Sequence, residues 1–211
     1  VFWGILMLTV LLGYGKGIQN GIESGFTTNA ANSVWIFSWR TTVPYRGHSP
    51  GRRIQFTNED LEAIKNEIPG IRHVSSENPL GSGRGGDILI THKDKSGSFG
   101  VFGVGDNYFK IKRYQDYLEG RRINELDGLE TRKIAAIGTL VAERLFPGNP
   151  NPVGKEININ GVNFRVVGLF HDTESNGRNS ERIYVPLSIY QRAFGGGNNL
   201  HLLTYEPSDE V

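Results

Sequence analysis

A glycine-rich stretch of the chain has the spacing of a phosphate-binding loop. Residues 81–86, GSGRGG, contain a formal GxGxxG pattern. Such a loop holds a pyrophosphate when it follows a strand and opens a helix, because the N-terminus of the helix then faces the anion. Here the residues that follow predict a strand, so we do not expect a nucleotide to bind. A second stretch, residues 148–155, lacks P-loop spacing and is followed by Glu156 where Ser or Thr would ligate Mg²⁺.

Three neighbouring side chains, His171, Asp172 and Glu174, carry nitrogen and oxygen atoms that suit a metal ion. They lie in an Asn- and Gly-rich segment without the helical spacing that fixes a metal site, so we expect a solvated loop. The chain has no cysteine, which excludes thiolate ligands, a thiol nucleophile and disulfides. It also has no GxSxG elbow. The sequence therefore predicts no catalytic residue, no cofactor and no metal, and favours a binding or transmission domain over an enzyme.

Composition narrows the class of partner. The chain has 211 residues and a formal net charge of +1, and 37% of its residues are hydrophobic. This is enough for one large or two small domains with a buried core. A near-neutral chain argues against a protein that binds nucleic acid by neutralising phosphates. The arginine pairs 52–53 and 121–122 stand far apart and indicate solvated surface.

The first thirteen residues, VFWGILMLTVLLG, are apolar and uncharged, and they continue into a polar, helix-like segment. A bilayer-spanning helix needs about 20 apolar residues, whereas a run of about 10–14 is also typical of a buried core helix. A signal peptide would need a basic start and a cleavage site of small residues, and neither is present. We predict that residues 1–28 are the end of a transmembrane helix and its stalk, with further apolar residues expected before Val1.

Four glycines, Gly13, Gly17, Gly21 and Gly25, recur every four residues along this segment and share one helical face. Each interior glycine costs a helix about 1 kcal/mol relative to alanine, so the series needs a reason. Small residues at this spacing let two helix backbones approach closely. The face either packs on the protein's own second membrane helix or belongs to a coupling rod that moves against a neighbour. The sequence leaves both open.

The rest of the chain predicts strands and helices in alternation. Residues 34–39 alternate as a strand, with Trp35, Phe37 and Trp39 on one face, which we expect to pack in the core. A helix is expected to begin after the N-cap Thr57, with Asp60 in its first turn, and to end before residues 69–70. Further strands are expected at 71–75, 87–92, 99–104, 132–137, 156–159, 162–170, 183–185 and 200–205, and further helices at 139–146 and 186–194.

This order of elements predicts an α+β fold. The flanking segments form βαββ and αβ, which join across an insert into a ferredoxin-like βαββαβ unit. We therefore predict a porter-like lobe formed by residues 29–106 plus 183–211, and an inserted β-rich lobe at residues 107–182. Asn160-Gly161 is a strong hairpin signal within the insert.

Several segments in this order are similar to one known family. They are GYGKGIQNGI, FTNEDLEAI with PGIRHVS, GVGDNYFKIKRYQDYLEGRRI, KIAAIGTLVAERLF, NPVGKEININGVNFRVVGLF and RIYVPLSIYQ. The chain resembles the periplasmic core domain of MacB-like and FtsX-like ABC transporter permeases. The resemblance covers most of the chain, and the set of segments is more specific than any single one.

The resemblance implies an extracytoplasmic domain of a permease in the bacterial inner membrane, with this domain in the periplasm. It would transmit ATP-driven movement in order to export or extract a substrate. It would work with an ABC ATPase, which is either fused or a separate subunit, and with a second permease copy. A periplasmic adaptor, an outer-membrane channel or a lipoprotein would be further partners.

Three alternatives remain open at the level of sequence. Lipoprotein release and non-transporting regulation of a cell-wall hydrolase would use the same architecture. A membrane-anchored sensor or solute-binding domain would instead need a concave pocket with convergent polar groups, which the aromatic face at residues 35–39 would line. The sequence identifies neither the cargo nor the adaptor. Residues 42–53 and 173–181 are the exposed loops where we expect partner choice to lie.

Overall fold

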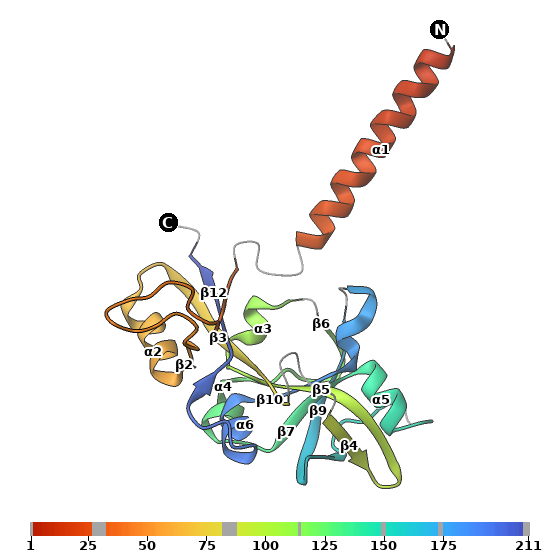
Figure 1. Ribbon diagram of the computed structural model, residues 1–211. Helices are drawn as coiled ribbons and strands as arrows, with labels where there is room; N and C mark the ends of the chain where they lie inside the picture. Colours follow the sequence, from red (N-terminus) through yellow and green to blue (C-terminus); the bar gives the residue numbers. More distant parts are fainter. Residues whose placement is uncertain are drawn as a thin grey trace.

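The computed structural model describes residues 2–26, 33–81, 88–113, 115–148, 151–172 and 175–208. In the first range, α1 (Phe2–Phe26) is one continuous helix that stands apart from the remaining elements (Figure 1). Its large apolar side chains from Phe2 to Ile18 are exposed. None of the helices in the described ranges has the length and apolar character needed to cross a bilayer. Most of the glycine-rich stretch, residues 82–86, lies outside the described residues.

Three antiparallel strands form what we call the outer sheet: β1 (Val34–Phe37), β12 (Leu202–Pro207) and β3 (Ile71–Pro79). β12 lies between the other two. Val34 is paired with Tyr205, so the start of β1 lies beside the end of β12. The first residue of β1 and the last residues of β12 therefore lie at the same end of this sheet.

The helix α2 (Asn58–Glu67) packs against β3 and begins as the sequence predicts. The Thr57 side chain accepts a hydrogen bond from the backbone N–H of Asp60, and the Asp60 carboxylate accepts one from the backbone N–H of Thr57. This capping box satisfies backbone donors at the helix start that have no partner within the helix.

One long strand connects the outer sheet to the rest of the domain. β5 (Lys95–Val104) pairs over its first half with β4 (Ile88–His92) and over its last residues with β3. On its other edge, its last five residues pair in parallel with β10 (Arg182–Pro186). β5 is therefore shared between two layers of strands.

Six of the described strands close into a barrel. Its remaining members are β7 (Ile134–Gly138), β9 (Val162–Asp172) and β8 (Glu156–Ile159). β10 pairs with β7, β7 with β9, β9 with β8, and β8 pairs back to β4, which is already joined to β5. Closure removes the free strand edges that would otherwise need protection.

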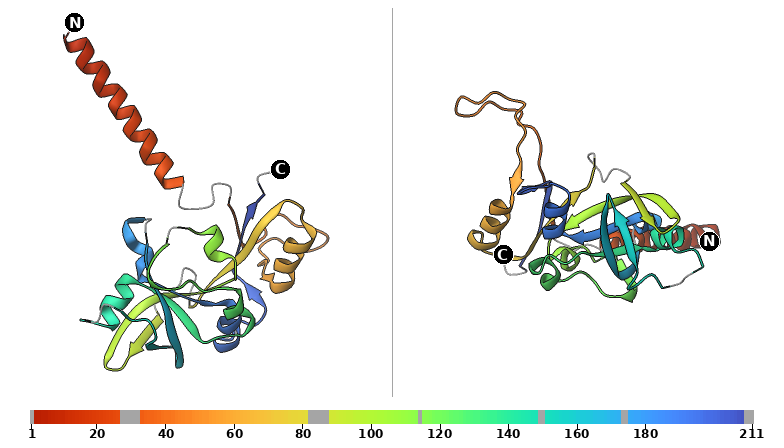
Figure 2. Two further views of the ribbon diagram at one scale, coloured as in Figure 1. Left: turned by 180° about the vertical axis from the view of Figure 1, so that it is seen from behind. Right: turned by 90° about the horizontal axis from the view of Figure 1, so that it is seen from below.

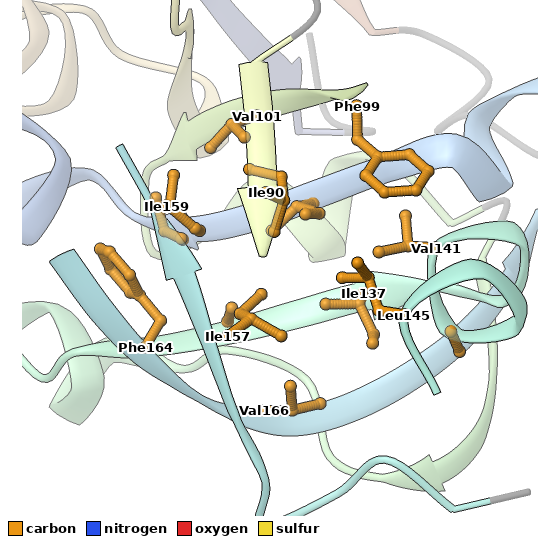
Figure 3. Packing of buried hydrophobic residues seen from close by; sticks show 14 of the residues in the cluster. Ile90, Phe99, Val101, Ile137, Val141, Leu145, Ile157, Ile159, Phe164 and Val166 are labelled. Atoms are coloured by element: carbon orange, nitrogen blue, oxygen red, sulfur yellow. The ribbon is translucent and has the colours of Figure 1, made fainter. Parts of the chain in front are cut away.

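The barrel interior is filled with side chains and forms the larger core of the domain. Figure 3 shows apolar side chains from opposite strands meeting in the interior, with the helix α5 (Thr139–Leu145) contributing beside them. The buried residues labelled there are Ile90, Phe99, Val101, Ile137, Val141, Leu145, Ile157, Ile159, Phe164 and Val166. The hairpin between β8 and β9 turns at Asn160 and Gly161, whose φ angles of +46° and +87° fit the predicted turn.

The remaining elements are short, and most were not expected from the sequence. They are β2 (Phe56–Thr57), α3 (Tyr108–Ile111), β6 (Gln115–Gly120), α4 (Glu125–Leu129), the 3₁₀ helix η1 (Ser175–Glu181), α6 (Leu187–Ala193) and β11 (Asn199–Leu200). Of these, α6 corresponds to the helix expected at residues 186–194.

The predicted α+β class is confirmed. The finer ferredoxin-like arrangement is not confirmed: the strand order through this region is β1-β12-β3-β5. The division into a lobe of residues 29–106 plus 183–211 and an insert of residues 107–182 stays a prediction.

The expectation that the aromatic face of the first strand packs in the core was wrong. β1 ends at Phe37, and the side chains of Phe37 and Trp39 are 62% and 77% exposed, so they do not pack in the core. The reason is position, because β1 pairs with β12 alone among the described strands and is an edge of the sheet. Trp35 is half-buried, and the Lys112 ammonium lies 4.5 Å from the centre of its ring.

Candidate functional site at the junction of outer sheet and barrel

A buried carboxylate, Glu77, lies where the outer sheet meets the barrel. It is on β3, where it pairs with Leu202 of β12 on one side and with Val104 of β5 on the other. Only 7% of the residue is exposed. A carboxylate at this depth needs partners, because an uncompensated buried charge is strongly unfavourable.

Three side chains supply those partners. The Tyr108 hydroxyl donates to Glu77 Oε2 at 2.6 Å, and the Lys112 ammonium donates to the same oxygen at 2.7 Å. The Arg182 guanidinium lies 3.8 Å from Glu77 Oε1. We call Glu77, Tyr108, Lys112 and Arg182 the junction. Its members come from β3, from α3 and the residue after it, and from the barrel strand β10.

The charges of the junction decide the protonation state of Glu77. Burial alone raises the pKa of this carboxyl, but Lys112, Tyr108 and Arg182 outweigh burial and hold the pKa below its ordinary value. Glu77 is therefore ionised at neutral pH, and its hydrogen bonds are of the stronger, charge-assisted kind.

A second carboxylate ties the same region to β12. Glu206 is largely buried and lies 3.0 Å from the Arg113 guanidinium and 4.0 Å from that of Arg72. Consecutive cations at positions 112 and 113 therefore bind carboxylates on two different strands of the outer sheet. This arrangement holds the segment after α3 across the sheet.

On its other side, α3 packs into an aromatic cluster against the barrel. The Phe109 ring lies 5.5 Å from that of Tyr184 on β10, and Tyr184 lies 5.4 Å from Phe170 on β9, measured between ring centres. Tyr108 also contacts Tyr184, at 5.5 Å. Such aromatic pairs add stabilisation beyond the area they bury. The short helix α3 thus links the outer sheet, through charge, to the barrel, through aromatic packing.

A third buried carboxylate fixes the segment that leads into the barrel strand β7. Asp127 is fully buried and accepts hydrogen bonds from two nitrogens of Arg121, at 2.5 and 2.8 Å, and from Arg132 at 3.0 Å. Burial raises the pKa of Asp127, but the hydrogen bonds, that from Arg121 foremost, lower it below its usual range. Arg121 is exposed, as the sequence predicts, and is in addition an ion-pair partner of the buried Asp127.

The sequence-predicted glycines all lie in α1, away from the junction. A Cβ added at Gly13 or Gly17 would meet no atom within 4 Å, and the side-chain positions of Gly21 and Gly25 are outside the described set. The described residues therefore provide no partner for this face, and its coupling role stays a prediction.

The candidate metal ligands do not form a site in the described chain. No group of three or more His, Cys, Asp or Glu side chains there is arranged to hold a metal ion, and Glu174 lies outside the described residues. Asp172 is not solvated as expected. It is 1% exposed, and its carboxylate accepts a hydrogen bond from the backbone N–H of Asn179 at 3.0 Å.

Two surface hollows bear on binding. A largely apolar groove of about 690 Å³ lies between β6 and α5, with Leu118, Phe146 and Leu169 among its lining residues. A smaller pocket of about 230 Å³ is lined by Ser38, Trp39, Arg40, Arg53 and His201. Of the three aromatics proposed to line a solute pocket, Trp39 alone is among its lining residues.

Signals for the junction in the sequence are weak. Tyr108 and Lys112 stand four residues apart, which places them on one face of a helical turn, but a helix of four residues is too short for a periodic pattern. Glu77 lies in a polar run, HVSSENP, whose composition does not indicate that it is buried.

The family follows from the whole chain. Residues 1–210 match the family described as the MacB-like periplasmic core domain. The chain belongs to this family.

The MacB-like core domain has relatives that are named as export proteins. It is 33% identical over 195 residues to a macrolide export ATP-binding/permease protein MacB of Bdellovibrio bacteriovorus, covering 91% of this chain and 29% of the relative. It is 25% identical over 199 residues to a pyoverdine export ATP-binding/permease protein PvdT of Pseudomonas syringae, covering 91% of this chain and 28% of the relative. The chain thus spans less than a third of the length of these relatives.

Solved structures have the same fold as this MacB-like core domain. The periplasmic region of MacB from Actinobacillus actinomycetemcomitans superposes with a TM-score of 0.69 at 22% identity, covering 88% of this chain and 79% of that one. The extracellular domain of the transporter YknZ from Gram-positive bacteria gives a TM-score of 0.66 at 19% identity, covering 85% of each chain. At these identities the likeness establishes the fold alone.

Proposed function

We propose that this chain is the extracytoplasmic domain of an ABC transporter permease and transmits ATP-driven movement between the membrane and the periplasm. ATP is hydrolysed outside this domain, in a separate part of the same protein or in another subunit. The observation that carries the proposal is the family match over residues 1–210, together with relatives named as ATP-binding/permease proteins of export.

The arrangement of the chain ends supports a domain anchored at one end. Val34 and Tyr205 are paired neighbours, so force applied to the segment before β1 and to the segment after β12 reaches the same end of the outer sheet. Both segments can therefore lead towards one membrane, which we propose to be the bacterial inner membrane. The rest of the domain then lies in the periplasm.

The junction supports a mechanical role. It joins the outer sheet, where the chain ends lie, to the barrel through a buried carboxylate and short, charge-assisted hydrogen bonds. A fully paired network of this kind is stiff and geometrically specific. We propose that movement of the outer sheet is passed to the barrel through Glu77 and α3.

The partners follow from the same proposal. An ABC ATPase supplies the energy, and a second permease copy forms the moving pair. A periplasmic adaptor with an outer-membrane channel, or a lipoprotein, receives or supplies the cargo. The glycine face of α1, formed by Gly13, Gly17, Gly21 and Gly25, is the surface on which the stalk moves against a neighbouring helix.

The test replaces two glycines of this face by leucine, G17L with G21L, in the full-length permease with its ATPase. This chain has no cysteine, so after replacement of any cysteine elsewhere in the full-length protein by serine, one reporter, L89C, can be labelled at an exposed position of β4 in each copy. In the parent protein, ATP should change the distance between the two labels, measured by electron spin resonance. In G17L/G21L, ATP hydrolysis should continue while the ATP-dependent change in distance is lost.

A matched control places the same substitutions on a part of α1 that is turned away from Gly17 and Gly21. Gly4 and Gly15 lie within about 20° of each other around a helix of 3.6 residues per turn, about 140–160° from Gly17 and about 100–120° from Gly21. An added Cβ meets nothing within 4 Å at either control position. G4L/G15L should keep the ATP-dependent change in distance. An unchanged response in G17L/G21L would sink the coupling role of the glycine face.

A further inference from the structure

A projecting two-stranded ribbon, residues 39–54, is the most distinctive exposed feature of the domain, and we call it the basic arm. Its two halves are held together by backbone hydrogen bonds, from Ile54 to Trp39 at 2.9 Å and from Thr41 to Arg52 at 2.8 Å. Near the tip, Tyr45 and His48 exchange two such bonds. The right-hand view of Figure 2 shows this segment reaching well away from the other elements.

The arm has little support from the rest of the domain. All its residues are exposed except Thr41, which is half-buried. An isolated two-stranded ribbon is at best marginally stable in water. A ribbon held out in this way gains stability when a partner covers it.

The arm carries positive charge and no negative charge. It contains four arginines, Arg40, Arg46, Arg52 and Arg53, and no Asp or Glu. Among the described residues, no carboxylate lies within ion-pairing distance of any of the four.

One pair of these arginines indicates that the arm lacks an anionic partner. Arg40 and Arg53 are paired directly opposite each other across the ribbon. Like charges in this position destabilise a pair of strands. An anionic partner would remove the repulsion, because its carboxylates would lie between or beside the two guanidinium groups.

The arm also presents apolar surface beside its charges. Trp39, Val43 and Tyr45 are 77%, 70% and 67% exposed. At the base of the arm, Trp39, Arg40 and Arg53 are among the residues that line the pocket of about 230 Å³. Aromatic and arginine side chains around a pocket are the composition that carries most binding energy in protein interfaces.

The position of the arm favours a protein over a lipid surface. Its base is fixed where the backbone N–H of Ser38 donates to the carbonyl of His201, at 3.2 Å. This is the end of the β1–β12 pair opposite to Val34 and Tyr205, where the chain enters and leaves the sheet. If the chain ends face the membrane, as the proposed function holds, the arm begins on the side that faces away from it.

We propose that the basic arm is a docking surface for a protein partner that presents a carboxylate-rich surface outside the membrane. The four arginines bind the carboxylates of the partner, and the pocket at the base receives an apolar side chain. The inference rests on the proposed function only for the side of the membrane on which the partner lies.

The test measures binding to the complete chain in neutral detergent micelles, with a fluorescein-labelled polyglutamate peptide as the acidic probe. The arm variant is R46E/R52E, which leaves the arginine pair at the base in place. The matched control, K133E/R165E, makes the same change in charge at two exposed positions beside the barrel hairpin. We expect the arm variant to raise the Kd by about tenfold or more, and the control to change it by less than about twofold.

A second readout reports whether the bound peptide lies beside the pocket at the base of the arm. Binding of the peptide should shift the tryptophan emission, and the shift should disappear in W39F, because Trp39 lies at the pocket. The conservative variant R46K/R52K, which keeps the charge, should retain most of the affinity.

Two results would overturn the proposal. Equal loss of affinity in R46E/R52E and K133E/R165E would mean that net charge alone drives binding. Arm-dependent binding to phosphatidylglycerol vesicles without binding to polyglutamate would mean that the arm binds an anionic lipid surface instead of a protein. Neither result depends on ATP, so failure of the transmission proposal, seen in the distance measurement above, is distinguishable from failure of this one.

Discussion

The Lys112 ammonium lies 2.7 Å from Glu77 Oε2, with 12% of the lysine side chain and 10% of the glutamate side chain exposed. The two residues are 35 positions apart in sequence and belong to different layers of the fold. Their contact, together with Tyr108 and Arg182, joins the outer sheet, which contains β1 and β12, to the barrel. The junction is therefore where the stability of the domain and its proposed mechanical role depend on the same atoms.

Substitution of Glu77 by glutamine should destabilise the domain by about 3 kcal/mol, because it removes the buried carboxylate that faces the Lys112 and Arg182 cations. Urea unfolding, followed by circular dichroism, measures the change. The control is E62Q on α2, where the glutamate and its partner Lys65 are both more than half exposed at 3.9 Å. The control should stay within about 0.5 kcal/mol of the parent. A loss below about 1 kcal/mol in E77Q would contradict a structural role for the junction.

The effect of E77Q should also depend on pH. The junction holds the pKa of Glu77 below its ordinary value in the folded domain, although burial opposes this. The ionised carboxylate therefore stabilises the fold above the pKa of the unfolded chain, and the contribution is lost as pH falls through the folded pKa. The difference in unfolding free energy between the parent and E77Q should be full at neutral pH and shrink below about pH 4. A difference that stays constant down to about pH 2 would show that shape, not charge, causes it.

Removal of the charge of Asp106 should have the opposite effect on the stability of the domain. Partial burial of its carboxyl group, with the nearby charge of Glu125, raises the pKa of Asp106 above its usual value, although the residue as a whole is exposed. Its ionisation therefore costs the folded state stability, and the cost develops as pH rises through the pKa values of the unfolded and folded states. D106N should be more stable than the parent at pH 8, and the gain should vanish near pH 3, as measured by thermal unfolding at each pH. At the exposed Asp94, where a hydrogen bond from Lys95 lowers the pKa, D94N should bring no such gain at pH 8.

Local signals in the sequence were enough for elements whose causes are local. Thr57 and Asp60 predict the start of α2 because a capping box needs only those two side chains. Asn160-Gly161 predicts the β8–β9 hairpin because these residues adopt positive φ at low cost. In both cases the residues that decide the structure are within a few positions of each other.

The closure of the barrel and the junction depend on distant residues, and the sequence did not reveal them. Ile90 pairs with Ile159, and nothing in either strand specifies that partner. In the sequence, nothing distinguishes Glu77 from an exposed polar residue of a strand, because its partners on and after α3 come from a distant segment. Trp39 was expected in the core and is exposed, because alternation of residue types does not reveal that a strand lies at the edge of a sheet. Pairing between strands is set by the whole core, and a single sequence does not specify it.

The barrel core should respond sharply to loss of volume. Ile137 on β7 is fully buried and lies among the side chains that fill the barrel (Figure 3). I137A should lower the free energy of unfolding by about 3 kcal/mol, because a buried cavity remains where the side chain was. L126A is the control, since Leu126 on α4 is 57% exposed, and it should change stability by less than about 0.5 kcal/mol. Equal effects at the two positions would mean that the barrel interior is not tightly packed.

The turn from β7 into α5 should not tolerate a side chain. Gly138 has φ −77° and ψ 161°, a conformation open to every residue, so its glycine is required for space rather than for backbone freedom. A Cβ there would collide with the backbone carbonyl of Ser180 in η1. G138A should therefore force α5 and η1 apart and cost about 2–3 kcal/mol, measured by urea unfolding. In the control G15A, the new methyl group on α1 meets nothing within 4 Å, and the unfolding of the domain should be unchanged. If G138A were as stable as the parent, the close approach of η1 to the mouth of the barrel would not exist in solution.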